Sequence, residues 1–176
     1  MKSNWYALRV SCLIFGFVLT AQIAQAQTCA ADTSANNPTA AYSITSDTVT
    51  DTRTGLIWDR CAWGLSGADC AVGSAITMTW PQALALPSAA NANFHKTYSD
   101  WRLPNIRELA SLLEHCRVAP TINEFAFPKT PALLFWSNSP VEPVVQNSWV
   151  VEFSTGNVGG NTRSGTNLVR LVRAGQ

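Results

Sequence analysis

The chain has 176 residues, 47% of them hydrophobic, with 12 Lys and Arg against 11 Asp and Glu. This length is enough for one domain with its own core. The formal net charge of +1 excludes a general nucleic-acid-binding surface, because such a surface needs clustered positive charge.

The first 26 residues have the organisation of a signal peptide. Lys2 and Arg9 supply a positive start, residues 10–19 form an apolar run, and Ala24-Gln25-Ala26 matches a cleavage site. A membrane anchor is the alternative, but a bilayer span needs roughly 20 apolar residues, and no later segment is apolar enough either. We therefore expect export to the periplasm or the cell exterior, with a mature chain that begins at Gln27.

The mature chain keeps four cysteines and loses two of its 12 basic residues, which leaves 10 against 11 acidic ones and a net charge of −1. An even cysteine count in an exported chain predicts two disulfides. Cys61 and Cys70 enclose a short glycine-containing loop, so we pair them, and Cys29 then pairs with Cys116. A zinc site is the alternative, but the chain has no C-x-x-C spacing and only two histidines.

The first part of the mature chain reads as a flexible leader followed by a hairpin. Residues 27–41 show no periodicity, and we expect the leader to be fixed only by its cysteine. Residues 48–50 and 56–58 flank a polar turn at 51–55 that ends in Gly, which predicts a hairpin. Residues 59–78 are expected to form a loop closed by a disulfide.

A first helix is predicted from Thr79 to about residue 92. Thr79 and Gln82 have the spacing of a capping box, in which each side chain bonds the backbone of the other residue. Pro81 is tolerated there because the first turn does not need its N–H.

A second helix is predicted from Asn105 to about His115. Asn105 and Glu108 again have capping-box spacing, and Pro104 prevents an earlier start. Four apolar residues follow at helical spacing and predict a buried face: Ile106, Leu109, Leu112 and Leu113.

The last third of the chain predicts strands. Residues 117–135 are broken by prolines and are expected to pack irregularly, followed by strands at 134–136, 148–153 and 167–173. A turn at 154–157 follows the middle strand. Strands, two helices and again strands make an α+β order.

Several large side chains are assigned structural roles. Three tryptophans lie inside predicted elements or at their start and are expected in the core: Trp58, Trp101 and Trp149. Arg170 and Arg173 lie on opposite faces of one predicted strand, because they are an odd number of residues apart. One of them is expected to be buried and paired with Glu108 or Asp100.

Five segments together resemble the Lcl C-terminal domain family, named for a collagen-like adhesin of Legionella. They are Thr48–Asp51 with Thr54–Trp58, Trp101–Leu109, Trp136–Ser139, Ser148–Phe153 with Gly156, and Val169–Arg173. The resemblance implies a domain over residues 42–176 with a fold similar to C-type lectins and sulfatase-modifying factors. This is a compact α+β domain in which two helices pack on short antiparallel sheets stapled by disulfides. It also implies an adhesin-like recognition role.

The sequence favours binding over catalysis, so we expect no enzyme and no cofactor. His95 and His115 are the two histidines, residues 64–68 lack the last Gly of a nucleophile elbow, and no H-E-x-x-H occurs. Glu142-Pro143-Val144 resembles a sugar-binding motif of calcium lectins, but Val144 replaces its amide residue. Four basic residues that suit sulfate are separated in sequence and favour scattered surface charge: Arg53, Arg60, Lys129 and Arg163.

A ligand surface is predicted between Trp136 and Arg163, because recognition surfaces tend to lie on irregular connections. Its members are Asn138, Glu142, Asn147, Asn161 and Arg163. The expected partner is a glycan or a protein of the cell envelope. A structural envelope module without its own pocket, or an unrecognised enzyme, are the alternatives.

Overall fold

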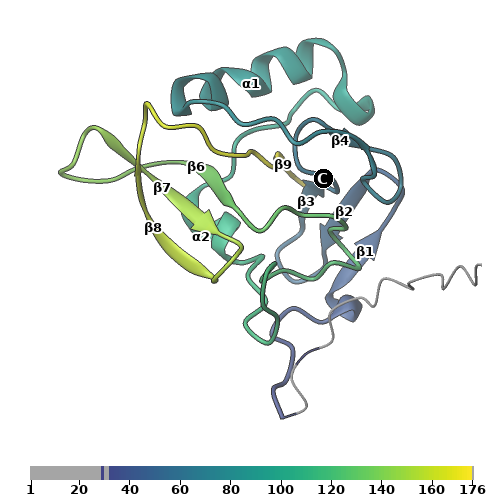
Figure 1. The fold of residues 1–176 in the computed structure, drawn as a ribbon. Helices are drawn as coiled ribbons and strands as arrows, with labels where there is room; N and C mark the ends of the chain where they lie inside the picture. Colours follow the sequence, from purple (N-terminus) through teal and green to yellow (C-terminus); the bar gives the residue numbers. More distant parts are fainter. Residues whose placement is uncertain (1–28, 30–31, 176) are drawn as a thin grey trace, which may run out of the picture.

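The computed structural model describes Cys29 and residues 32–175, so the predicted signal peptide lies outside the described residues. Two larger antiparallel sheets lie side by side, and a long helix crosses above them (Figure 1). The first sheet has the order β1-β2-β3-β9, with β1 Tyr42–Ile44, β2 Thr48–Asp51, β3 Leu56–Asp59 and β9 Val172–Ala174. The second has the order β6-β7-β8, with β6 Leu134–Pro140, β7 Asn147–Glu152 and β8 Asn157–Thr162.

The smaller elements connect these sheets. A two-stranded ladder joins β4 (Leu65–Ser66) to β5 (Val72–Gly73), and two 3-10 turns are η1 (Thr39–Ala41) and η2 (His95–Thr97). The result is a mixed helix and sheet domain with antiparallel sheets and two disulfides, which confirms the predicted class in this coarse form. Among the described residues, no helix is both long and apolar enough for a bilayer span.

The predicted hairpin is confirmed as β2 and β3. Thr48 faces Asp59 across the pair, and the turn closes with the Gly55 N–H donating to the Asp51 carbonyl at 2.8 Å. Gly55 has a φ of +72°, a conformation that glycine adopts without steric cost. β1 was not predicted, and it pairs with the outer edge of β2.

Helix α1 (Trp80–Ala92) forms as predicted. The Thr79 N–H donates to Gln82 Oε1 at 2.9 Å, and the capping box is complete. Pro81 occupies the first turn, where no intrahelical partner is lost. Ala83 and Ala90 are the buried residues of this helix, and the half-buried Trp80 and Leu86 also pack against the core.

Helix α2 (Ile106–Ala110) is shorter than predicted. Its start is correct, since Asn105 Oδ1 accepts the Glu108 N–H at 2.9 Å and Glu108 accepts the Asn105 N–H at 2.8 Å. The helix ends early because Leu113 forms a β-bridge with Ile122, which requires the chain to turn back. The apolar face continues past the helix end, since Leu109 in α2 and Leu112 in the following turn have no exposed surface.

The tryptophan assignment is correct for Trp58 and Trp101, which are at most 2% exposed, and wrong for Trp149. Trp149 is half-buried, because the alternation along β7 turns its neighbours Ser148 and Val150 inward and Trp149 outward. Trp136 on β6 is fully buried instead. The predicted strand at 167–173 shortens to β9, and its first residues make only isolated bridges.

Both predicted disulfides, Cys29–Cys116 and Cys61–Cys70, are present. The described part of the predicted leader is held by more than its cysteine. The Asn36 and Asn37 N–H groups donate to the buried Glu114 carboxylate at 3.0 and 2.8 Å. A buried carboxylate needs such donors, so this segment is tied into the domain.

Candidate functional site

The predicted ligand surface lies along the β6, β7 and β8 strands, and we call its five residues the hairpin surface: Asn138, Glu142, Asn147, Asn161 and Arg163. Asn138 is exposed on β6, and Glu142 is exposed in the β6–β7 connection, where its bond to Pro143 is cis. Asn147 begins β7 and Asn161 lies on β8, both half-buried. The β6-β7-β8 sheet and its connections therefore carry all five residues, of which Asn138 and Glu142 are exposed and the other three are half-buried.

Arg163 is already engaged within the domain. Its guanidinium carbon lies 4.2 Å from the centre of the Trp80 ring, and its Nε donates to Ser148 Oγ at 2.9 Å. Asn161 Nδ2 donates to Asn167 Oδ1 at 3.3 Å. Trp136 is fully buried, so it offers no apolar platform to a ligand. A ligand at this surface would compete with contacts that exist without it.

A second region has the chemistry of a binding site and was not predicted. A cavity of about 260 Å³ opens between the end of β3, the β4 loop and η2. Its apolar wall is made by Trp63, Leu65 and Ile76, and its polar side by Asp59, Ser66 and His95. We call this cavity the His95 pocket.

The centre of the His95 pocket is a short histidine–aspartate contact. His95 Nε2 lies 2.6 Å from Asp59 Oδ2, and Asp59 Oδ1 accepts the Cys61 N–H at 3.2 Å. The Asp59 side chain is 3% exposed and the His95 side chain 24%. The Asp59 contact uses Nε2, and no described residue forms a hydrogen bond with His95 Nδ1.

Aromatic rings hold the imidazole on two sides. The ring centre of His95 lies 5.0 Å from that of Trp63 and 5.9 Å from that of Trp101. Trp101 Nε1 also donates to the His95 carbonyl at 2.7 Å. The buried Trp101 thereby fixes the backbone of His95, while the half-buried Trp63 is part of the cavity wall.

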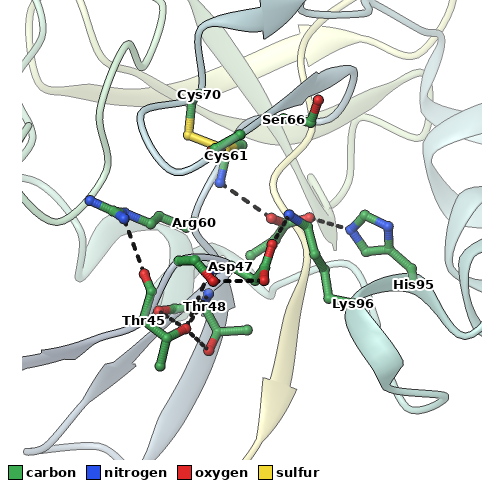
Figure 2. Close-up of polar contacts among 12 residues, drawn as sticks. Thr45, Asp47, Thr48, Arg60, Cys61, Ser66, Cys70, His95 and Lys96 are labelled. Atoms are coloured by element: carbon green, nitrogen blue, oxygen red, sulfur yellow. Dashed lines mark hydrogen bonds and ion pairs between the residues drawn. A yellow bond between two sulfur atoms is a disulfide. The ribbon is translucent and has the colours of Figure 1, made fainter.

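The backbone around His95 is unusual. Phe94, Lys96 and Thr97 have φ values of +48°, +53° and +69°. A non-glycine residue in this region costs about 1–3 kcal/mol and persists only where surrounding contacts impose it. One such contact is the Lys96–Asp47 ion pair at 2.7 Å (Figure 2). The hydrogen bond from Lys96 lowers the pKa of Asp47, which favours the carboxylate form of this residue.

Arg170 supports the backbone of the pocket, while the predicted pairing of a buried arginine with an acidic residue is confirmed for Arg173. Arg170 is fully buried and donates to the carbonyls of Asp59 and Arg60 and to Thr130 Oγ1. Burial lowers its pKa to about 10, which leaves it protonated at neutral pH. The buried Arg173 donates to Asp100 at 2.6 Å, as predicted, and the other candidate partner, Glu108, accepts from Arg102 at 2.7 Å.

The pocket lacks the geometry of a serine hydrolase. Ser66 lines it, but the Ser66 hydroxyl points away from His95 (Figure 2) and lies 3.5 Å from the Val72 carbonyl. A nucleophile and its base need to be within hydrogen-bond reach. Over the described residues, the group of His, Cys, Asp and Glu side chains close enough to hold a metal is Cys29, Glu114 and Cys116, whose cysteines form a disulfide.

Sequence reasoning missed this site because its two central residues are 36 positions apart. In the sequence, His95 is one residue of a polar loop, and Asp59 is the first residue after the predicted hairpin. The rarity of histidine in this chain was the one available signal, and it did not point to Asp59.

Residues 47–173 match the family model of the Lcl C-terminal domain. No curated protein matches the chain. The matched range includes the hairpin surface, the His95 pocket and Arg170, but not Cys29.

Proposed function

The chain belongs to the Lcl C-terminal domain family, and from this premise we propose that it is an exported, non-catalytic recognition domain of the cell envelope. Its ligand is a glycan or an envelope protein. Two disulfides are consistent with export, because such bonds persist in oxidising compartments. The proposal includes a fold related to C-type lectins, in which irregular connections form the recognition surface.

The observation that carries the proposal is the His95 pocket. It combines a mostly apolar wall with a few polar groups held in place, which is the usual composition of a small-molecule site. The Asp59 contact fixes the imidazole before a ligand arrives, and a fixed group loses little entropy on binding. Because the Ser66 hydroxyl points away from the imidazole, the arrangement is suited to holding a ligand and not to acyl transfer by this serine.

The hairpin surface is the second place where a ligand would bind. The side chains of Arg163 and Asn161 each donate a hydrogen bond within the domain, and each is partly exposed. Guanidinium groups suit anionic oxygen acceptors. A larger ligand would contact this surface as well as, or instead of, the pocket.

The test is a glycan array with the oxidised mature protein, read with and without calcium. The parent is compared with His95→Ala and with the double variant Arg163→Ala/Asn161→Ala, each checked for an unchanged thermal unfolding temperature. We expect glycan signals that weaken in at least one variant. A silent array, together with recovery of one envelope protein by the immobilised parent, would leave protein recognition as the function. Silence in both assays contradicts the proposal and favours a structural envelope module.

A further inference from the structure

We propose that the His95 pocket is a subsite for one neutral pyranose ring of a glycan. This inference rests on the proposed recognition function and makes it specific. The ring would lie with its apolar C–H face on Trp63 and with hydroxyl groups toward His95 and Ser66.

The size of the cavity limits the ligand to one ring. Its volume is about 260 Å³, just below the roughly 300–1,000 Å³ typical of sites for drug-sized ligands. A single sugar residue fits this space, and the next residues of a chain would extend into solvent. The disulfide Cys61–Cys70 closes the loop that carries Trp63 and Ser66, so the space is held open by covalent structure.

The apolar part of the lining suits a sugar face. Trp63 is half-buried, and its ring is packed against the imidazole on one side at an interplanar angle of 54°. Leu65 and Ile76 extend the apolar wall. An indole offers a wide apolar surface at a low entropy cost, since only two side-chain torsions need to be fixed.

The polar side suits hydroxyl groups in particular. When His95 Nε2–H donates to Asp59, Nδ1 is an acceptor; when the imidazole is protonated, Nδ1–H is a donor. A hydroxyl both donates and accepts, so it matches His95 in either state. Ser66, whose bond to the Val72 carbonyl is long at 3.5 Å, adds a second hydroxyl partner at another point of the rim.

The charges favour a neutral ring over a sulfated one. Asp59 is the carboxylate of the lining, and the neighbouring cations are engaged elsewhere. Lys96 bonds Asp47, and Arg170 is fully buried on backbone carbonyls. A sulfate group here would meet a carboxylate without a free guanidinium or ammonium, and desolvating such a group costs several kcal/mol unless it is paired. A tyrosine side chain of a protein partner also has a ring and a hydroxyl, but it offers only one polar group to a rim that has several.

In the experiment, the oxidised mature protein is titrated with methyl glycosides of neutral hexoses and of N-acetylglucosamine. Calorimetry and tryptophan fluorescence measure the binding. The sulfate esters of the same glycosides and N-acetyl-tyrosine amide are titrated in parallel. We expect at least one neutral glycoside to bind and its sulfate ester to bind about tenfold more weakly. Trp63→Ala should weaken binding at least about tenfold and His95→Ala about tenfold, the loss that one hydrogen bond at a fixed site accounts for.

The control is Arg107→Ala, an exposed residue of α2 that belongs neither to the pocket nor to the hairpin surface, and it should bind the glycoside as tightly as the parent. The subsite is overturned if no neutral glycoside binds, if a sulfate ester or the tyrosine amide binds more tightly, or if Trp63→Ala binds unchanged. If Trp63→Ala does not fold, Trp63→Phe is titrated in its place, and the NMR shifts of the His95 ring are followed as the glycoside is added to the parent. Unchanged binding by Trp63→Phe together with unchanged His95 shifts would overturn the subsite. A positive glycan array with an unaffected Trp63→Ala overturns the subsite alone, whereas silence in array and partner recovery overturns the recognition function itself.

Discussion

The His95 pocket and the hairpin surface both present polar side chains, but they differ in what holds those side chains in place. In the pocket, His95 is fixed by a carboxylate that is 3% exposed, and the backbone beneath is fixed by the fully buried Arg170. At the hairpin surface, Glu142 and Asn138 are exposed, and Arg163 lies on Trp80.

This difference shows where binding geometry is prepared in advance. A polar group held by buried partners keeps its orientation without a ligand, because moving it would leave those partners unsatisfied. An exposed side chain on a strand is hydrated and free to change its orientation. Fixing it in one orientation costs entropy, and this cost reduces its contribution to binding. Four predictions test this contrast, from the largest expected effect to the smallest.

The first prediction compares two arginines, one from each region. Arg170→Met should lower the free energy of unfolding by about 3–5 kcal/mol, because it leaves buried carbonyls and a nearby carboxylate without their cation. Arg163→Met should cost no more than about 1 kcal/mol, since its contacts are partly exposed. Urea denaturation of both variants measures the difference. Equal effects would show that the pocket is no better supported than the hairpin surface.

The second prediction concerns the disulfides. Replacing Cys29 and Cys116 by Ser should cost about 4 kcal/mol, and replacing Cys61 and Cys70 about 2–3 kcal/mol, because the longer loop restricts the unfolded chain more. Only the loss of Cys61–Cys70 removes the closure of the loop that carries Trp63 and Ser66, which we call the pocket loop. It should therefore weaken glycoside binding more than the first change does. Denaturation and titration of both double variants provide the measurement, and the reverse order in binding would contradict the role of the pocket loop.

The third prediction tests whether α2 supports the β6-β7-β8 sheet, since this helix packs against β6 and β7. Leu109→Ala should cost about 2–5 kcal/mol as a large-to-small change at a position with no exposed surface. Asn105→Ala should cost about 0.5–2 kcal/mol through loss of the cap. Chemical denaturation gives both values. If Leu109→Ala left the free energy of unfolding nearly unchanged, the β6-β7-β8 sheet would not depend on this helix.

The fourth prediction is a pH dependence at the same helix. Burial alone would raise the pKa of Glu108, but the hydrogen bonds from Arg102 and the Asn105 N–H and the charge of Arg102 together lower it. The stabilisation by Glu108 is therefore fully present above its ordinary pKa of 4.5 and is lost as the pH falls through the lowered folded value.

Comparing the parent with Glu108→Gln measures this effect. The stability difference should be up to about 1 kcal/mol near neutral pH, because Arg102 is 41% exposed and solvent screens the pair. Below pH 4.5 the difference should shrink. A difference that is constant through the acid range would exclude the ion pair as its source.

The sequence alone determined the features that depend on neighbouring residues. Both capping boxes, the β2–β3 hairpin and the cysteine pairs followed from residues that are close along the chain or limited in number. The family resemblance is confirmed for the same reason, since it rests on ordered local segments. Local hydrogen bonds and turn conformations have few alternatives, so short patterns identify them.

Only the tertiary structure decided the features that depend on distant partners. The bridge between Leu113 and Ile122 ended α2 early, and strand alternation turned Trp149 outward while Trp136 became buried. Packing also decided that Arg173 bonds the predicted Asp100 while Arg170, also buried, bonds backbone carbonyls. The His95–Asp59 contact joins residues 36 positions apart, and no local pattern encodes it. A buried polar group bonds whichever partner the packed chain brings within reach, and that partner is set by the whole fold.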